Sequence, residues 1–216
     1  LGEWKIKIYF DGASNTYGGG LDEEGHSLDC RFSKLVSDHY GAEEFNISRG
    51  GAATNTVLRH LFTGKYRQIE FDIKDFDAFV IELPFFHREE YYSEPAHAWR
   101  RYKPDWALSK KYLEVKEKIY RFTIRSFIAE LGKPLVLIYS SPQIYSMDYD
   151  LFLSKGYKYA RLIEGHPNPQ GHRQIADDII KVLTPRLWST FLMLTVHSLL
   201  VGNPWTYLSW HTLLYL

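Results

Sequence analysis

Cysteine, methionine and net charge are what this sequence has least of. Its 216 residues include two Met and one Cys, Cys30. A single cysteine excludes a disulfide within the chain and a multi-cysteine zinc site. The 26 Lys and Arg are balanced by 26 Asp and Glu, so the formal net charge at pH 7 is zero. This balance argues against a protein that binds nucleic acid through broad electrostatic attraction.

Charge is also missing from the C-terminal part of the chain. Arg186 is the last charged residue, and 187–216 contains no Asp, Glu, Lys or Arg. We therefore predict a globular domain over 1–186 and an uncharged hydrophobic tail over 187–216. The tail is interpreted as a hydrophobic anchor, a partner-binding segment or sequence that is not native coding. Its first apolar stretch, 187–201, is shorter than the ~20 residues of a spanning helix, which argues against membrane contact.

What the sequence does contain indicates an ordered domain. It is 45% hydrophobic and 24% charged. A chain of this length buries roughly 70% of its unfolded surface, so it needs neither a disulfide nor a metal to fold. Apolar runs alternate with segments of helical periodicity. The runs predict strands at 4–10, 43–47, 78–83 and 135–139, and a weaker one at 158–163. The periodic segments predict helices at 27–39, from Val57 to Gly64, at 108–131 along the face of Tyr112, Val115, Ile119 and Phe122, and from Pro169 onward with Asn168 as N-cap.

This alternation predicts a mostly parallel sheet covered by helices on both faces. Ligands of such sheets bind beyond the carboxyl ends of the strands. Between the third strand and the long helix, residues 85–104 are aromatic and charged and contain Pro95 and Pro104. We expect a long loop there, and loops of that length are often functional.

Three segments that follow strands carry residues suited to nucleophilic chemistry. Residues 11–20 are rich in glycine and contain Ser14. Residues 46–55 place Gly50 and Gly51 at a helix entry, where free backbone N–H groups can meet an oxyanion. Residues 164–172 place His166 before the last helix, and histidine, with a pKa of about 6.5, can accept and return a proton. Singly each is an ordinary turn; together they supply a nucleophile, a base and oxyanion donors at one edge.

In their order along the chain and in their residues, these segments resemble the sequence blocks of the SGNH (GDSL-type) hydrolases over roughly residues 4–186. The run Gly-Ala-Ser-Asn-Thr-Tyr-Gly at 12–18 resembles the first block, with Ser14 in the place of the nucleophile. Residues 46–54 resemble the second, with Gly51 as the oxyanion glycine. His-Pro-Asn at 166–168, followed by Gly-His at 171–172, resembles the last block. That block places the base at His166 and leaves His172 a structural role.

The chain departs from the family pattern in three places. Ala13 stands where the first block usually has Asp, and residues 81–86 read Ile-Glu-Leu-Pro-Phe-Phe where an Asn oxyanion donor is expected. Asn55 and Arg88 are candidates for the missing donor. The acid of the family lies three residues before the histidine, but the nearest carboxylate here is Glu164, two before. Either Glu164 takes that role, or a slower Ser-His dyad operates.

The resemblance implies an α/β fold, a three-layer α/β/α sandwich with a mostly parallel, flavodoxin-like sheet. It also implies a serine esterase that hydrolyses small acyl esters, with O-acetyl groups on carbohydrate as one candidate substrate. Two alternatives stay open: a non-catalytic SGNH-like carbohydrate-binding protein, and a flavin-binding flavodoxin-like protein, because 14–18 loosely resembles a phosphate loop.

We expect a small-molecule or glycan ester as partner, and we expect neither a nucleic acid nor a cofactor. We also expect no metal, because His87 and His97 lack metal-ligand spacing. The sequence begins at Leu1 without a basic-then-apolar segment, so it predicts no compartment.

Overall fold

The central feature of the fold is a five-stranded parallel sheet. The computed structural model describes residues 5–84, 88–96, 98–102, 109–140, 148–153, 159–162 and 165–201. The sheet has the order β2-β1-β5-β8-β9, and every neighbouring pair is parallel. Its strands are β1 (Lys7–Asp11), β2 (Glu43–Asn46), β5 (Ala78–Leu83), β8 (Leu135–Tyr139) and β9 (Leu151–Phe152). The predicted parallel sheet is confirmed.

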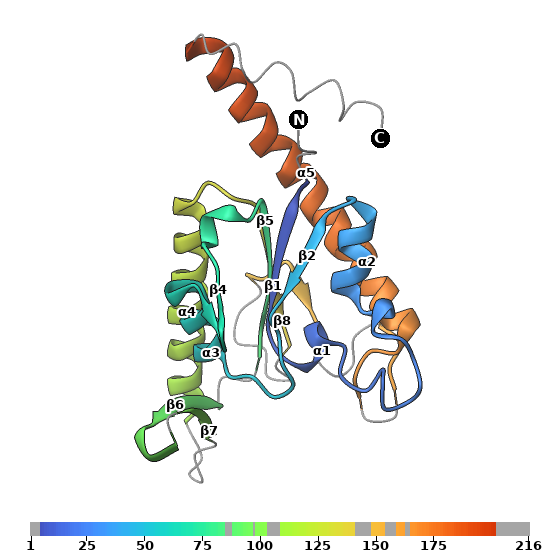
Figure 1. Cartoon of the computed structure of the whole chain (residues 1–216), viewed down its shortest axis with the longest axis vertical. Helices are drawn as coiled ribbons and strands as arrows, with labels where there is room; N and C mark the ends of the chain where they lie inside the picture. The colour runs from blue at the N-terminus through green and yellow to red at the C-terminus, as the bar shows by residue number, and fades with distance from the viewer. Residues whose placement is uncertain are drawn as a thin grey trace.

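Helices cover both faces of this sheet, as Figure 1 shows. On one face lie α2 (Phe32–His39) and α5 (Pro169–Val201), and on the other lie α3 (Thr54–Thr63) and α4 (Lys110–Glu130). The predicted three-layer α/β/α sandwich is therefore confirmed. The smaller elements are α1 (Ser14–Tyr17), η1 (Leu28–Cys30), the β3 (Lys65–Tyr66) and β4 (Ile69–Glu70) pair, and η2 (Ile73–Asp75).

The strands bury side chains on both faces, because successive residues of a strand point to opposite sides. The side chains that pack toward α2 and α5 are Ile8, Phe10, Ala78, Val80, Val136 and Ile138. Those that pack toward α3 and α4 are Tyr9, Phe79, Ile81, Leu83, Leu135, Leu137 and Tyr139. This double burial explains why β5 and β8 read as continuous apolar runs rather than as alternating ones.

The segment predicted as a long loop, 85–104, contains a β-hairpin, so that prediction was wrong. Strands β6 (Glu89–Ser93) and β7 (Ala98–Tyr102) pair antiparallel around a turn of 3-10 helix, η3 (Glu94–Ala96). Aromatic residues favour strands, and cross-strand aromatic pairs stabilise them. The rings of Tyr92 and Trp99 pack edge to face, 5.6 Å apart between centroids. Pro95 interrupts no ladder because it lies in the turn.

The fifth strand of the sheet is also displaced from its predicted place at 158–163. Strand β9 forms at 151–152, beside β8. Of the predicted range, the described residues 159–162 contain one isolated bridge, from Arg161 to Pro167. The reason is that the Leu162 N–H donates to the carbonyl of His166, at 2.7 Å, and closes a turn instead of extending a ladder.

Helix α4 is present as predicted, but the apolar face read from its periodicity is exposed. Leu113, Ile124 and Ile128 are buried instead, together with Glu117. Oε1 of Glu117 accepts hydrogen bonds from Arg121 Nε at 2.8 Å and from the Tyr149 hydroxyl at 2.6 Å. Periodicity shows which residues share a face, but the packing partners decide which face is covered. The exposed residues of the predicted face are Tyr112, Val115, Ile119 and Phe122.

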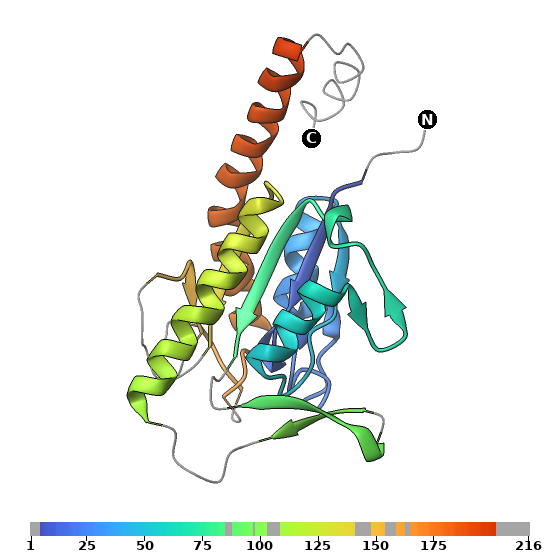
Figure 2. The same cartoon turned by 90° about the vertical axis from the view of Figure 1, so that its left-hand side faces the viewer.

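Helix α5 begins as predicted. Asn168 Oδ1 accepts a hydrogen bond from Gly171 N at 2.8 Å, and Pro169 occupies the first turn. The helix then continues past Arg186 to Val201, and its last turns extend beyond the sheet (Figure 2). The domain boundary at 186 stays a prediction. Within the described residues, no helix has both the length and the apolar character needed to span a membrane.

His172 packs α5 against α2. Its ring is fully buried, and its Nδ1 accepts a hydrogen bond from Phe32 N at 3.2 Å. Burial, followed by the nearby charges of His166 and Arg31, lowers the pKa of His172 to about 4. His172 therefore stays neutral near pH 7 and has the structural role that the sequence predicted.

This lowered pKa predicts a pH-dependent stability. Between pH 4 and about 6.5 the unfolded chain binds a proton at His172 that the folded chain does not. The free energy of unfolding should therefore be highest above about pH 6.5, and fall by up to about 3 kcal/mol toward pH 4. Urea unfolding monitored by tryptophan fluorescence should show a weaker pH dependence for His172→Asn. The exposed-site control His26→Asn should retain the wild-type dependence, and equal slopes in all three proteins would contradict the assignment.

Candidate active site

Ser14 and His166, 152 positions apart in the chain, meet at the carboxyl edge of the sheet. Ser14 is the first residue of α1, directly after β1, and its Oγ lies 3.0 Å from Nε2 of His166. Both side chains are part-buried. A hydroxyl at this distance from an imidazole nitrogen can transfer its proton to the ring and become a nucleophile. The structure thus brings together the two residues that the sequence assigned as nucleophile and base.

The turn that carries Ser14 is held by Glu82, a residue that the sequence reading missed. Glu82 lies on β5 and is fully buried. Its Oε2 accepts hydrogen bonds from Ala13 N at 3.1 Å, Thr16 N at 3.0 Å and the Thr16 hydroxyl at 2.6 Å. Its Oε1 accepts one from Asn15 Nδ2 at 2.7 Å. The available signal was one carboxylate in the otherwise apolar run 78–83, since a buried charge requires partners.

Glycines give this turn the space that it needs. A Cβ on Gly12 would lie 2.5 Å from the Cβ of Glu82, so only glycine allows the chain to pass the carboxylate this closely. A Cβ on Gly20, where φ is +85°, would lie 2.8 Å from Leu162 and 3.6 Å from Nδ1 of His166. The glycine-rich loop therefore packs directly against the imidazole.

His166 is held in a hydrogen-bonded turn ahead of α5. The Gly165 N–H donates to the carbonyl of Leu162 at 3.0 Å, and Gly165 has a φ of +90°. Nδ1 of His166 is buried and has no hydrogen-bond partner among the described residues. Glu164 lies outside the described residues, so its role as the triad acid stays a prediction.

The backbone N–H groups of Ser14 and Gly51 are the predicted oxyanion hole, and this role stays a prediction. Among the described residues, none accepts a hydrogen bond from the N–H of Ser14. Gly51 lies in the turn between β2 and α3 with a φ of +69°. That turn is tied to the Ser14 turn by the Arg49 N–H, which donates to the carbonyl of Gly12 at 3.3 Å, and by Asn46 Nδ2, which donates to that of Thr16 at 3.1 Å. The two loops are therefore in contact.

The other two predicted oxyanion donors lie at the hairpin. The side chain of Asn55 pairs with the backbone of Glu90: its Nδ2 donates to the carbonyl at 2.8 Å, and its Oδ1 accepts from the N–H at 3.0 Å. Asn55 therefore joins α3 to β6. Arg88 directly precedes β6. No described contact brings Asn55 or Arg88 to Ser14, and their roles as oxyanion donors stay predictions. No metal-holding group of His, Cys, Asp and Glu occurs within the described part of the chain.

Solved structures with the same fold include two carbohydrate esterases. An acetyl xylan esterase (Est2A) from the rumen bacterium Butyrivibrio proteoclasticus aligns with a TM-score of 0.57 at 15% identity, over 87% of this chain and 66% of that chain. A family two carbohydrate esterase from Clostridium thermocellum, in complex with cellohexaose, aligns with a TM-score of 0.57 at 12% identity. The alignment covers 87% of this chain and 66% of that chain. TesA aligns with a TM-score of 0.51 at 14% identity, over 83% of this chain and 99% of that chain.

This chain has the fold of these three proteins. The resemblance to SGNH hydrolases seen in the sequence is therefore confirmed for the fold. The chain spans about two thirds of the length of the two carbohydrate esterases. No protein-family model matches the sequence, and no curated protein matches it significantly.

The contacts of Glu82 predict a large effect of its removal. Glu82→Ala should lower the free energy of unfolding by at least about 3 kcal/mol, because the three donors to Glu82 Oε2 lose their buried acceptor, at about 1–3 kcal/mol each. Urea titration measures this change. The control Glu70→Ala removes an exposed carboxylate that pairs with Lys65 at the surface, and it should leave stability near the wild-type value. Equal effects of the two substitutions would show that Glu82 does not hold the turn.

Proposed function

We propose that the protein is a serine esterase that hydrolyses small acyl esters through an acyl-enzyme. The observation that carries this proposal is the 3.0 Å contact between Ser14 Oγ and His166 Nε2, in a chain with an esterase fold. The hydroxyl is a weak nucleophile by itself, and the neighbouring imidazole supplies the base that it needs.

The reaction proceeds in two halves. Nε2 of His166 takes the hydroxyl proton as Ser14 Oγ attacks the carbonyl carbon of the ester, and the N–H groups of Ser14 and Gly51 bind the oxyanion that forms. His166 then returns the proton to the departing alcohol, which leaves the acyl group on Ser14. In the second half a water molecule attacks the acyl-enzyme, with His166 again acting as base and then as acid.

The orientation of the His166 ring decides whether it can act as the base. For Nε2 to accept the serine proton, the ring must carry its hydrogen on Nδ1, which a neighbouring acceptor would stabilise. Glu164 is the proposed acceptor, with a Ser-His dyad as the alternative. In either case, the turn closed by Leu162 and the glycines of the Ser14 loop keep the ring in place.

The hairpin supports a carbohydrate as the carrier of the ester. Tyr91, Tyr92 and Trp99 are 51%, 43% and 43% exposed on β6 and β7, and Arg59 lies 4.7 Å from the centre of the Trp99 ring. Exposed aromatic side chains offer an apolar surface with polar edges, which suits a sugar ring. The carbohydrate esterases of the same fold point to the same substrate class. We therefore propose acetyl esters on carbohydrate as the substrate.

The same aromatic hairpin favours a second candidate, a non-catalytic carbohydrate-binding protein. The absence of an Asn in residues 81–86 agrees with that candidate, because one oxyanion donor would be missing. We do not propose flavin binding, since a phosphate at residues 14–18 would compete with the contact between Ser14 and His166.

Hydrolysis of p-nitrophenyl acetate and release of acetate from acetylated xylan test the proposal. Ser14→Ala and His166→Asn should each lower kcat by at least about 1,000-fold, whereas Ser189→Ala, which changes an exposed serine of α5, should not. A fluorophosphonate probe should label the wild type at Ser14. A Ser14→Ala protein as active as the wild type would refute the mechanism. An unlabelled protein that binds xylan would favour the second candidate.

A further inference from the structure

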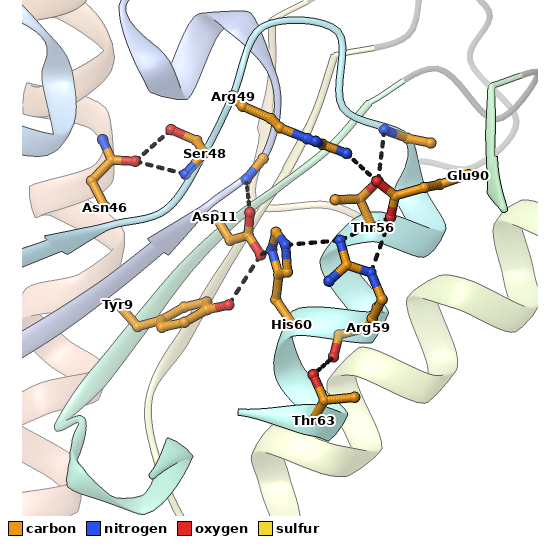
Figure 3. Close-up of polar contacts among 12 residues, drawn as sticks. Tyr9, Asp11, Asn46, Ser48, Arg49, Thr56, Arg59, His60, Thr63 and Glu90 are labelled. Atoms are coloured by element: carbon orange, nitrogen blue, oxygen red, sulfur yellow. Dashed lines mark hydrogen bonds and ion pairs between the residues drawn. The ribbon is translucent and has the colours of Figure 1, made fainter. Parts of the chain in front are cut away.

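A second buried histidine pairs with a carboxylate behind the Ser14 turn. Asp11 is the last residue of β1, and its Oδ1 accepts a hydrogen bond from Gly12 N at 2.7 Å. Its Oδ2 accepts one from the Tyr9 hydroxyl at 3.0 Å and lies 2.8 Å from Nδ1 of His60, on α3. All three side chains are buried, and Figure 3 shows them in a line from β1 toward α3.

The two contacts of the His60 ring assign a role to each of its nitrogens. Arg59 Nη2 lies 3.3 Å from Nε2 of His60, and a guanidinium can only donate, so Nε2 accepts. Nδ1 then carries the hydrogen and donates it to Asp11. Both ring nitrogens of His60 are engaged, so the ring serves as a connector between Asp11 and Arg59.

Glu90 of the hairpin continues this connection. Its carboxylate is buried, and its Oε2 accepts from Arg59 Nε at 3.1 Å and from Arg59 Nη2 at 3.0 Å. Its Oε1 forms an ion pair with Arg49, the residue directly before Gly50 and Gly51 (Figure 3). Hydrogen bonds between charged groups are shorter and stronger than neutral ones, so this carboxylate holds both arginines firmly.

The connection closes into a ring at the active-site loops. The Arg49 N–H donates to the carbonyl of Gly12 at 3.3 Å, and the Gly12 N–H donates to Asp11. The ring thus contains a residue of the loop that carries Ser14 and a residue of the loop that carries Gly51. Its members in order are Gly12, Asp11, His60, Arg59, Glu90 and Arg49.

We propose that Glu90 is a positioning residue that holds the oxyanion loop, through Arg49, at the correct distance from Ser14. This inference rests on the proposed esterase function and deepens it. The Glu90 carboxylate contacts Arg49 and Arg59, and it acts on the reaction through the loop that contains Arg49. A displacement of about 1 Å in a catalytic group can lower a rate about 100-fold, so the ring has a direct consequence for kcat.

The neighbouring residue offers a matched control. Glu89 is on the opposite face of β6, because side chains alternate along a strand, and it pairs with Lys116 of α4. Glu89 and Glu90 therefore both attach the hairpin to a helix, but of the two it is Glu90 whose described contacts include Arg49. If Glu90→Gln lowers kcat and Glu89→Gln does not, the loss arises from the loop that contains Arg49 and Gly51. It does not arise from weaker attachment of the hairpin.

The first test is kinetic, with p-nitrophenyl acetate at a temperature below unfolding of all variants. Glu90→Gln should lower kcat about 10- to 100-fold, with KM within about 3-fold of the wild type. Glu89→Gln should retain the wild-type kcat. Arg49→Gln should reproduce the loss, and the double variant should lose no more than Glu90→Gln alone, because both substitutions remove the ion pair between Arg49 and Glu90. Equal kcat values for Glu90→Gln and Glu89→Gln would overturn the proposal.

The second test does not depend on catalysis. Amide hydrogen exchange should become faster at Arg49 and Ala52, whose N–H groups are hydrogen-bonded within and beside the loop, in Glu90→Gln but not in Glu89→Gln. Unchanged exchange at these amides would overturn the positioning role. A wild-type protein that hydrolyses no ester, yet shows the expected change in exchange, would refute the proposed function and keep the role of Glu90 in holding the loop.

Discussion

The site depends on one buried carboxylate, that of Glu82. A charge placed inside an apolar sheet is costly unless hydrogen-bond donors surround it. All the described donors to Glu82 come from residues 13–16, so the need to satisfy the charge shapes the turn that presents Ser14. Gly12 follows from the same constraint, because a side chain there would collide with Glu82.

A second buried carboxylate has a parallel role on the adjacent strand. Asp11 pairs in register with Ile81, the residue before Glu82, so both acids lie near the carboxyl edge of the sheet and their side chains point to opposite faces. Glu82 contacts α1 and thereby the Ser14 turn, whereas Asp11 contacts His60 of α3 and thereby the ring that reaches Arg49. The proposed nucleophile and the proposed oxyanion loop are thus each fixed from within the sheet.

Local signals in the sequence were sufficient for the parts of the fold that depend on neighbouring residues. The buried runs of β5 and β8 and the start of α5 at Asn168 follow from composition and spacing alone. The meeting of Ser14 and His166 followed from the rule that parallel strands share a carboxyl edge. Their catalytic roles stay predictions.

Other features depend on partners that are distant in the chain. Glu82 bonds to a residue 69 positions away, and its strand reads as an apolar run with one exception. The hairpin was not predicted because Pro95 and the charges of 85–104 indicate a loop. The cross-strand contact between Tyr92 and Trp99, which stabilises the two strands, cannot be read from the local sequence. In α4, burial of Glu117 with Tyr149 decided which face was covered.

The most direct test of the account is a crystal structure of the protein after reaction with a phosphonate ester, which resembles the tetrahedral intermediate. We predict phosphorus bonded to Ser14 Oγ, with the phosphonyl oxygen within hydrogen-bond distance of the N–H groups of Ser14 and Gly51. Phosphorus on another residue, an unmodified Ser14, or a phosphonyl oxygen directed away from both N–H groups would contradict it.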